Sequence, residues 1–166
     1  MGAANQQERR ETASWIVGFT DGEGCFSVSF IRNATNKSGW QIFPEFVITQ
    51  GVKSLPALEV FQTYFGCGKI FINKRYDNHH EHLYRFCIRS VDDLSGKIVP
   101  FFKRYRLRTA KQKDFLVFAK IIALMEQKQH YTPRGMRRIA NLVGTMNRKK
   151  RSRFLESPET IRRSPT

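Results

Sequence analysis

The sequence predicts an α+β fold in which helices alternate with β-hairpins and further helices follow. Two observations carry this prediction. Apolar residues recur at helical spacing in several segments, and twice the pattern changes to the strict alternation that is typical of strands. A chain of 166 residues with 40% hydrophobic content can bury one core, so we expect one domain. We place a polar arm at 1–11, the domain at 12–147 and a basic, flexible tail at 148–166.

The first expected elements are one helix and one strand. Thr12 can cap the helix, which is expected to run to about Thr20. Alternation with a period of two starts at Cys25, where Phe26 and Phe30 fall on one face. The chain therefore changes from helix to strand within a few residues.

A hairpin and a second helix follow. The polar segment 32–39 is expected to connect the first strand to a second strand at 40–50. Ser54 and Pro56 then open a helix that ends at Gly66, because glycine is favoured just past the last helical turn.

A second hairpin is expected from strands at 68–76 and 82–89, with a polar tip between them. Ser90 and Asp93 then have the spacing of a capping box, which predicts a helix start. Together the two hairpins predict a four-stranded antiparallel sheet.

Two longer helices complete the expected order, one from about Thr109 and one from Thr132. Their apolar stripes are expected in the core: Phe115, Phe118, Ile122, Met125, Ile139, Leu142, Val143 and Met146. Aromatic and methionine side chains at this spacing are typical of a core rather than of a cofactor site.

Charge and cysteine content narrow the function classes. The formal net charge is +15, which favours nucleic acid as a partner. Three scattered cysteines do not have the spacing of a zinc site or a disulfide framework, and a histidine group at 79–82 lies in a polar hairpin tip, which argues against a metal site there. No apolar run approaches a membrane span, and the polar N-terminal segment does not look like a targeting peptide, so we expect no membrane partner.

The most informative stretch is 14–24. Ser14, Gly18 and Gly22 lie four residues apart on one helical face, and small residues at that spacing let a second backbone approach closely. Asp21 and Glu23 follow where the helix gives way to the strand. Two acids there make a plausible divalent-metal site, because Mg²⁺ is bound by one or two carboxylates together with waters and phosphate oxygens.

Residues 16–24 resemble the motif of the LAGLIDADG homing endonucleases. Gly18, Asp21 and Gly24 coincide with letters of that motif, while Gly22 replaces its alanine and Glu23 its last aspartate. Further segments that resemble the family occur in the same order, so the resemblance covers about 12–147. It implies the αββαββα fold with extra C-terminal helices, and a site-specific endonuclease that cleaves double-stranded DNA.

The resemblance also implies the site residues. The last acid of the motif binds metal in the family, which makes Glu23 the main ligand, with the Gly22 carbonyl beside it and Asp21 as a weaker candidate. The metal would be Mg²⁺, with Mn²⁺ or Ca²⁺ able to take the same place. Gln50 matches a position that orients water, and Lys111 one that stabilises charge. Lys113 is a second candidate for that role and for DNA contact.

The face of the sheet opposite the helices is expected to read DNA in the major groove. Strand parity gives its outward side chains as Ser27, Ser29, Ile31, Asn33, Gln41, Glu45, Val47, Thr49, Lys69, Phe71, Asn73 and Arg75. On the fourth strand, Arg85 and Arg89 point outward if Tyr84 and Phe86 are core. The opposite parity, with His82 outward, stays open.

A single motif implies a homodimer, in which Ser14, Trp15, Gly18, Phe19 and Gly22 form the interface. Two-fold symmetry then predicts a roughly palindromic DNA site and a double-strand break. Two alternatives remain: a maturase that binds its host intron RNA, and a DNA-binding regulator that does not cleave. An organelle, either a chloroplast or a mitochondrion, or a bacterial cytoplasm would suit any of them.

Overall fold

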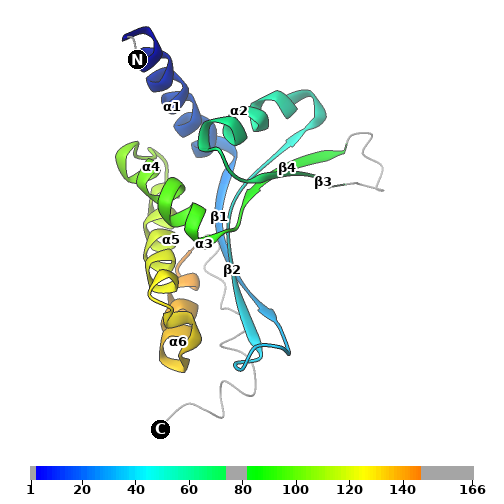
Figure 1. Ribbon diagram of the computed structural model, residues 1–166, viewed down its shortest axis with the longest axis vertical. Coiled ribbons are helices and arrows are strands. Elements are labelled where there is room, and N and C mark those ends of the chain that lie inside the picture. Colours follow the sequence, from blue (N-terminus) through cyan, green and yellow to red (C-terminus); the bar gives the residue numbers. More distant parts are fainter. Residues whose placement is uncertain (1–2, 74–81, 147–166) are drawn as a thin grey trace.

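One antiparallel sheet organises the molecule, which a computed structural model describes over residues 3–73 and 82–146. The sheet has four strands in the order β1-β2-β4-β3. The sheet bends, so that β1 and β2 run along the long axis of the molecule while β3 and β4 leave it at an angle (Figure 1). The helices lie on one side of this bent sheet and leave the other side open.

The strands keep the expected order and nearly the expected limits. β1 (Gly24–Arg32) pairs with β2 (Trp40–Gly51), and β3 (Lys69–Asn73) pairs with β4 (Leu83–Ile88). β4 also pairs with β2, which joins the two hairpins into one sheet. The four-stranded antiparallel sheet is therefore confirmed.

The helix-facing parity of the strands is also confirmed. Phe26, Phe46, Phe86 and Ile88 are at most 1% exposed and lie in one core cluster. The fourth strand therefore has Phe86 and Ile88 inward and Arg85 outward, and the alternative parity is wrong.

The first helix is longer than expected. α1 runs over Ala3–Glu23 and thus includes most of the segment expected to be an arm. Thr12 lies inside the helix, where its hydroxyl donates to the Glu8 carbonyl at 2.9 Å instead of capping a helix start. A threonine whose hydroxyl bonds back to the preceding turn is compatible with a helix interior. A threonine in the sequence therefore does not by itself mark the start of a helix.

The second helix begins and ends at the expected residues, and the third begins at the expected cap. α2 (Leu55–Phe65) stops at Gly66, whose φ of 58° is in the left-handed region. The Ser90 hydroxyl accepts from the Asp93 amide at 3.2 Å, as a capping residue does. Helical structure then continues through α3 (Val91–Asp93), a π-helical turn and α4 (Val99–Arg104).

The last two helices cover β1 and β2. α5 (Lys111–Glu126) buries the whole expected stripe, and α6 (Pro133–Val143) starts after Thr132, whose hydroxyl accepts from the Gly135 amide at 3.0 Å. α6 also buries Met136 and Ala140, which the expected core did not include. None of the helices in the described ranges is long and apolar enough to cross a membrane.

Candidate active site and DNA-binding surface

The end of α1 presents Glu23 at the molecular surface. Gly24 starts β1 directly after it and is fully enclosed: a Cβ there would lie 2.7 Å from the Thr20 methyl group. Only glycine fits this helix-to-strand junction. Gly22 and Glu23, within one turn of Thr20, remain exposed, so the Glu23 carboxylate faces solvent.

Lys111 binds the end of α1 from the first turn of α5. Its ammonium donates to the carbonyls of Thr20 at 2.7 Å and Asp21 at 3.0 Å. A cation is favourable at this negative end of a helix dipole. Burial lowers the pKa of Lys111, while the nearby Asp21 and Glu23 carboxylates act in the opposite direction. An ammonium has three N–H donors, and two of them have acceptors among the described residues, which leaves one N–H of Lys111 for a ligand.

Asp21 is engaged within the fold. One carboxylate oxygen accepts from the Arg108 amide at 2.8 Å, and the other accepts from the amide and the hydroxyl of Thr109, the latter at 2.7 Å. Partial burial raises the pKa of Asp21, but these hydrogen bonds outweigh it and the pKa lies below its ordinary value. Asp21 therefore ties α1 to the segment that precedes α5. Both of its carboxylate oxygens accept hydrogen bonds within the described part of the fold, unlike those of the exposed Glu23.

Gln50 lies at the same end of the sheet. Ile48 pairs with Gly24, so Gln50, two residues further along β2, is level with the last turn of α1. Gln50 is half-buried, and Lys113 is exposed on the first turn of α5.

Within the described ranges, no group of three or more His, Cys, Asp or Glu side chains could hold a metal ion.

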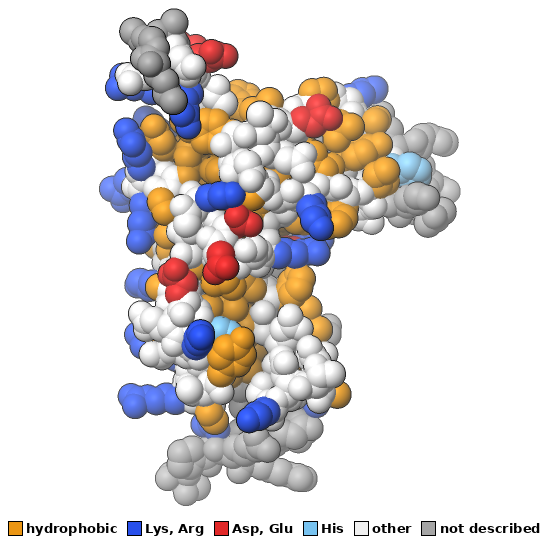
Figure 2. All heavy atoms as spheres, viewed as in Figure 1, with side chains coloured by type: hydrophobic (Ala, Val, Ile, Leu, Met, Phe, Trp, Pro, Cys, Tyr) orange, Lys and Arg blue, Asp and Glu red, His pale blue; other side chains and the backbone are white. Residues whose placement is uncertain are grey.

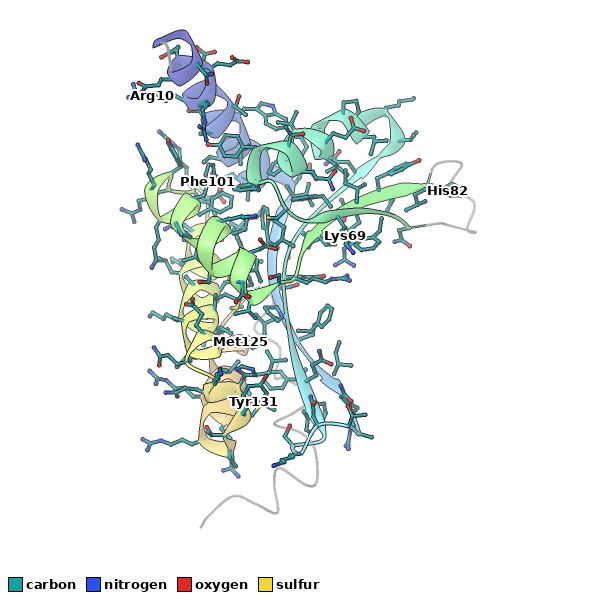
Figure 3. All side chains as sticks on the ribbon, viewed as in Figure 1. Arg10, Lys69, His82, Phe101, Met125 and Tyr131 are labelled. Atoms are coloured by element: carbon teal, nitrogen blue, oxygen red, sulfur yellow. The ribbon has the colours of Figure 1, made fainter. Side chains whose placement is uncertain are left out.

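The open face of the sheet carries most of the expected DNA-reading side chains. Those that are exposed or half-buried there are Ser27, Ser29, Ile31, Gln41, Thr49, Lys69, Phe71, Asn73 and Arg85, with Arg89 just past β4. Lys69 lies on the open side of β3 and β4 (Figure 3). Lys and Arg side chains gather where the sheet bends and also along the helical edge (Figure 2).

Three of the residues expected to read DNA are either buried or bonded to a neighbouring side chain, and a fourth lies outside the described ranges. Glu45 is 8% exposed and is paired with two arginines, and Val47 is 7% exposed between its strand neighbours. Asn33 lies in the hairpin turn and donates to the Gln41 side chain at 3.0 Å. Arg75 falls in the undescribed segment, so nothing places it.

Phe43 is a residue of the open face that the sequence prediction omitted. It has the outward parity of Gln41 and Glu45, and the Arg89 guanidinium carbon lies 5.0 Å from its ring centroid. Alternation along β2 could have found it, but an aromatic side chain in an apolar run looks like core.

The small-residue stripe of α1 is open. Ser14, Gly18 and Gly22 are exposed, and a Cβ at either glycine would have no heavy atom within 4 Å. Trp15 is 40% exposed and contacts Phe19, with ring centroids 5.0 Å apart. This face therefore has room for a second helix whose backbone packs close to the backbone of α1.

The chain belongs to the LAGLIDADG endonuclease family, whose model matches residues 16–122. It is 32% identical over 135 residues to "Probable intron-encoded endonuclease 3" of Neurospora crassa, a match that covers 80% of this chain and 24% of the relative. The chain thus spans about a quarter of the length of that curated relative.

Two solved homing endonucleases share the fold. I-TnaI superposes with a TM-score of 0.77 at 37% identity, over 90% of this chain and 97% of that one. I-SmaMI bound to cleaved DNA superposes with a TM-score of 0.79 at 33% identity, over 93% of this chain and 49% of that one. I-SmaMI bound to uncleaved DNA in the presence of calcium ions gives 0.78 at 34% identity, over 87% of this chain and 47% of that one.

Proposed function

We propose that this chain is a site-specific, divalent-metal-dependent DNA endonuclease that binds a long, roughly palindromic site as a homodimer and breaks both strands. One observation carries the proposal: the exposed Glu23 carboxylate ends the helix whose Thr20 and Asp21 carbonyls hold the Lys111 ammonium, at the junction of an open small-residue helix face and an open sheet face. Family membership supports the same reaction class.

The open face of α1 supports a homodimer. Packing of Ser14, Gly18 and Gly22 against the same residues of a second chain would bring two Glu23 side chains together at the symmetry axis. I-TnaI, which this chain covers over 97% of its length, has the size of one such domain. I-SmaMI is covered over only 49%, which leaves room for a second domain of the same size in its chain.

The sheet and the net charge support duplex DNA as the partner. β1 has nine residues, about 30 Å at roughly 3.3 Å per residue, which is comparable to about nine base pairs. A formal charge of +15 supplies the phosphate-neutralising field. Each chain would therefore read one half-site through the open face.

The donor set fits a shared Mg²⁺ site. One chain offers the free Glu23 carboxylate and the Gly22 carbonyl, and Asp21 is assigned a structural role. A second chain and the DNA phosphates would supply further oxygens, which is the coordination that Mg²⁺ prefers. When bound, a divalent cation neutralises phosphate charge and lowers the pKa of water.

The remaining chemistry falls to two side chains. Gln50, level with the end of α1, would orient the attacking water through its amide. The free N–H of Lys111 would donate to the developing charge on the scissile phosphate, while the two carbonyls of α1 fix the position of its ammonium. Lys113, exposed on the first turn of α5, would bind phosphate.

The test is cleavage of a defined DNA. Relatives of this chain are named intron-encoded endonucleases, so the substrate is the host gene without its intron. Purified protein should break this DNA on both strands at the insertion site in Mg²⁺ and should leave it intact in EDTA. Intact DNA in Mg²⁺, together with specific binding of the intron RNA, would favour the maturase alternative instead.

A further inference from the structure

A cluster on the open face of the sheet joins charged and aromatic side chains from three strands. Glu45 of β2 accepts hydrogen bonds from Arg85 of β4 and from Arg89, whose Nε lies 3.0 Å from Glu45 Oε2. The Arg89 guanidinium carbon also lies 5.0 Å from the Phe43 ring centroid and 5.5 Å from that of Phe71. A carboxylate and two rings thus hold one guanidinium.

Glu45 is placed to organise its neighbours rather than to contact DNA. Its side chain is 11% exposed, whereas the side chains of Arg85 and Arg89 are 36% and 41% exposed. A carboxylate that met the phosphate backbone directly would repel it, but here both of its oxygens face guanidinium groups. The pair contacts fix two long side chains before any ligand arrives, which lowers the entropy lost on binding.

The contacts of Arg89 leave a defined part of its guanidinium free. Glu45 occupies Nε, and the two terminal nitrogens have no hydrogen-bond partner among the described residues. Two parallel N–H groups on one planar fork match the O6 and N7 acceptors of guanine in the major groove. Rings that flank the fork restrict its rotation.

We infer that Arg89 reads a guanine in each half-site through its two terminal nitrogens, and that Glu45, Phe43 and Phe71 are positioning residues for it. This inference rests on the proposed DNA-binding function. It specifies one base of the site and the side chain that contacts this base. Arg89 is the specificity-determining residue of the cluster.

The register of the sheet gives the place of this guanine. Phe46 pairs with Ile88, so Glu45 lies beside Arg89, and on its other side Glu45 pairs with Ser27. Ser27 is three residues along β1 from Gly24, about 10 Å at roughly 3.3 Å per residue. The guanine is therefore expected about three base pairs outward from the phosphate beside Glu23.

The experiment selects binding sequences from a pool of duplexes with randomised half-sites, using wild type, Arg89→Lys and Glu45→Gln. Wild type should select one guanine per half-site at that distance. Arg89→Lys keeps the charge but loses the fork, so its preference for guanine over the other bases should fall on the order of tenfold or more at that position alone. Glu45→Gln should weaken the same preference and raise affinity for all sequences, because one negative charge is lost.

Lys120→Ala is the control, since Lys120 is exposed on α5 and takes no part in the cluster. It should select the wild-type sequence, and thermal unfolding should show that Arg89→Lys and Glu45→Gln are folded. Wild type that selects no guanine there, or Arg89→Lys with an unchanged preference, would overturn the inference.

The outcomes separate this inference from the proposed function. Cleavage by wild type with no Arg89-dependent guanine would leave the endonuclease standing and remove the inference. An Arg89-dependent guanine without cleavage in Mg²⁺ would support the inference and remove the nuclease reaction.

Discussion

Asp21 and Lys111 tie α1 to the start of α5 in both directions. The Asp21 carboxylate accepts from the backbone of Arg108 and Thr109, while the Lys111 ammonium donates to the backbone of α1. The tie fixes the place of Glu23, which itself forms none of these bonds. The same motif thus contains two carboxylates, two residues apart, with different roles. Asp21 holds two segments of the fold together, and Glu23 is proposed to bind the metal.

Asp21→Asn should lower stability in a pH-dependent way. The pKa of Asp21 lies below its ordinary value of 3.8, so the carboxylate stabilises the fold above that pH, and this contribution is lost as the pH falls through the folded-state pKa. At pH 7 the variant should lose at most about 1 kcal/mol, because solvent screens this carboxylate, and the difference from wild type should shrink below about pH 4. Urea unfolding across this range measures it. Glu59→Gln, at an exposed site on α2, is the control, and a deficit that does not change with pH would contradict the assignment.

Lys111 should set an alkaline limit on cleavage. Burial lowers its pKa below the ordinary value of 10.5, so the ammonium loses its proton at a lower pH than an exposed lysine does. Cleavage should therefore fall as the pH rises toward that lowered pKa. Lys111→Arg stays charged and should move the fall to higher pH, and Lys111→Met should reduce kcat on the order of a hundredfold with little change in DNA affinity. Identical alkaline limbs in wild type and Lys111→Arg would show that another group titrates.

At the scale of elements, periodicity predicted the strands well and the first helix poorly. The two hairpins were predictable because alternation of apolar side chains directly reports which face of a sheet is buried. The start of α1 was not, because the helix extends beyond the core and a polar helical segment has no apolar period to detect. The π-helical turn between α3 and α4 also leaves no signal in composition.

The candidate site was predictable in its residues but not in its contacts. The motif led to Asp21 and Glu23 as a pair, and only tertiary structure separates them, because Arg108 and Thr109 come from a distant part of the chain. Likewise, strand parity placed Glu45 outward, but its burial follows from Arg85 and other side chains on a neighbouring strand. Parity gives the face of a side chain and not its partners.

Gly18→Leu tests the α1 interface. The position is open in one chain, so the variant should fold as wild type does, but a branched side chain would force two α1 backbones apart at a cost of about 1 to 3 kcal/mol. Sedimentation should show a weaker dimer on and off DNA. Gly96→Leu is the matched control, because a Cβ at Gly96 also has no heavy atom within 4 Å and Gly96 is not part of the small-residue stripe of α1. Equal dimerisation of both variants would contradict the interface.

In the whole molecule, the shape of the bent sheet and the positive net charge both favour the proposed binding of DNA. The two hairpins enclose an open angle that the helices leave uncovered, and basic side chains lie where the sheet bends (Figures 1 and 2). With a net charge of +15, we expect a non-specific attraction to DNA phosphates in addition to any specific contacts. We therefore expect specificity to come from the side chains of the open face, and the remaining basic residues mainly to set affinity.

Truncation after Asn147 should separate these contributions. The residues removed, which lie outside the described ranges, include Arg148, Lys149, Lys150, Arg151 and Arg153. Full-length protein should lose on the order of 10³ to 10⁵ in affinity between 50 and 200 mM salt, if about six to ten phosphates are neutralised. The truncated protein should bind all sequences more weakly, with a shallower salt slope and the same preferred site. An unchanged slope would show that this segment does not bind phosphate, and an altered preference would show that it reads bases.

Glu23 is proposed to supply the catalytic carboxylate, while other residues supply DNA affinity. The most direct measurement compares wild type with Glu23→Gln on the intron-less host-gene site, recording cleavage in Mg²⁺ and binding by titration in parallel. Glu23→Gln should bind within about tenfold of wild type, since affinity comes from phosphate and base contacts, and it should cut neither strand. Substantial cleavage by the purified variant in Mg²⁺ would contradict this role of Glu23, because the reaction would then proceed without the carboxylate that is proposed to bind the metal.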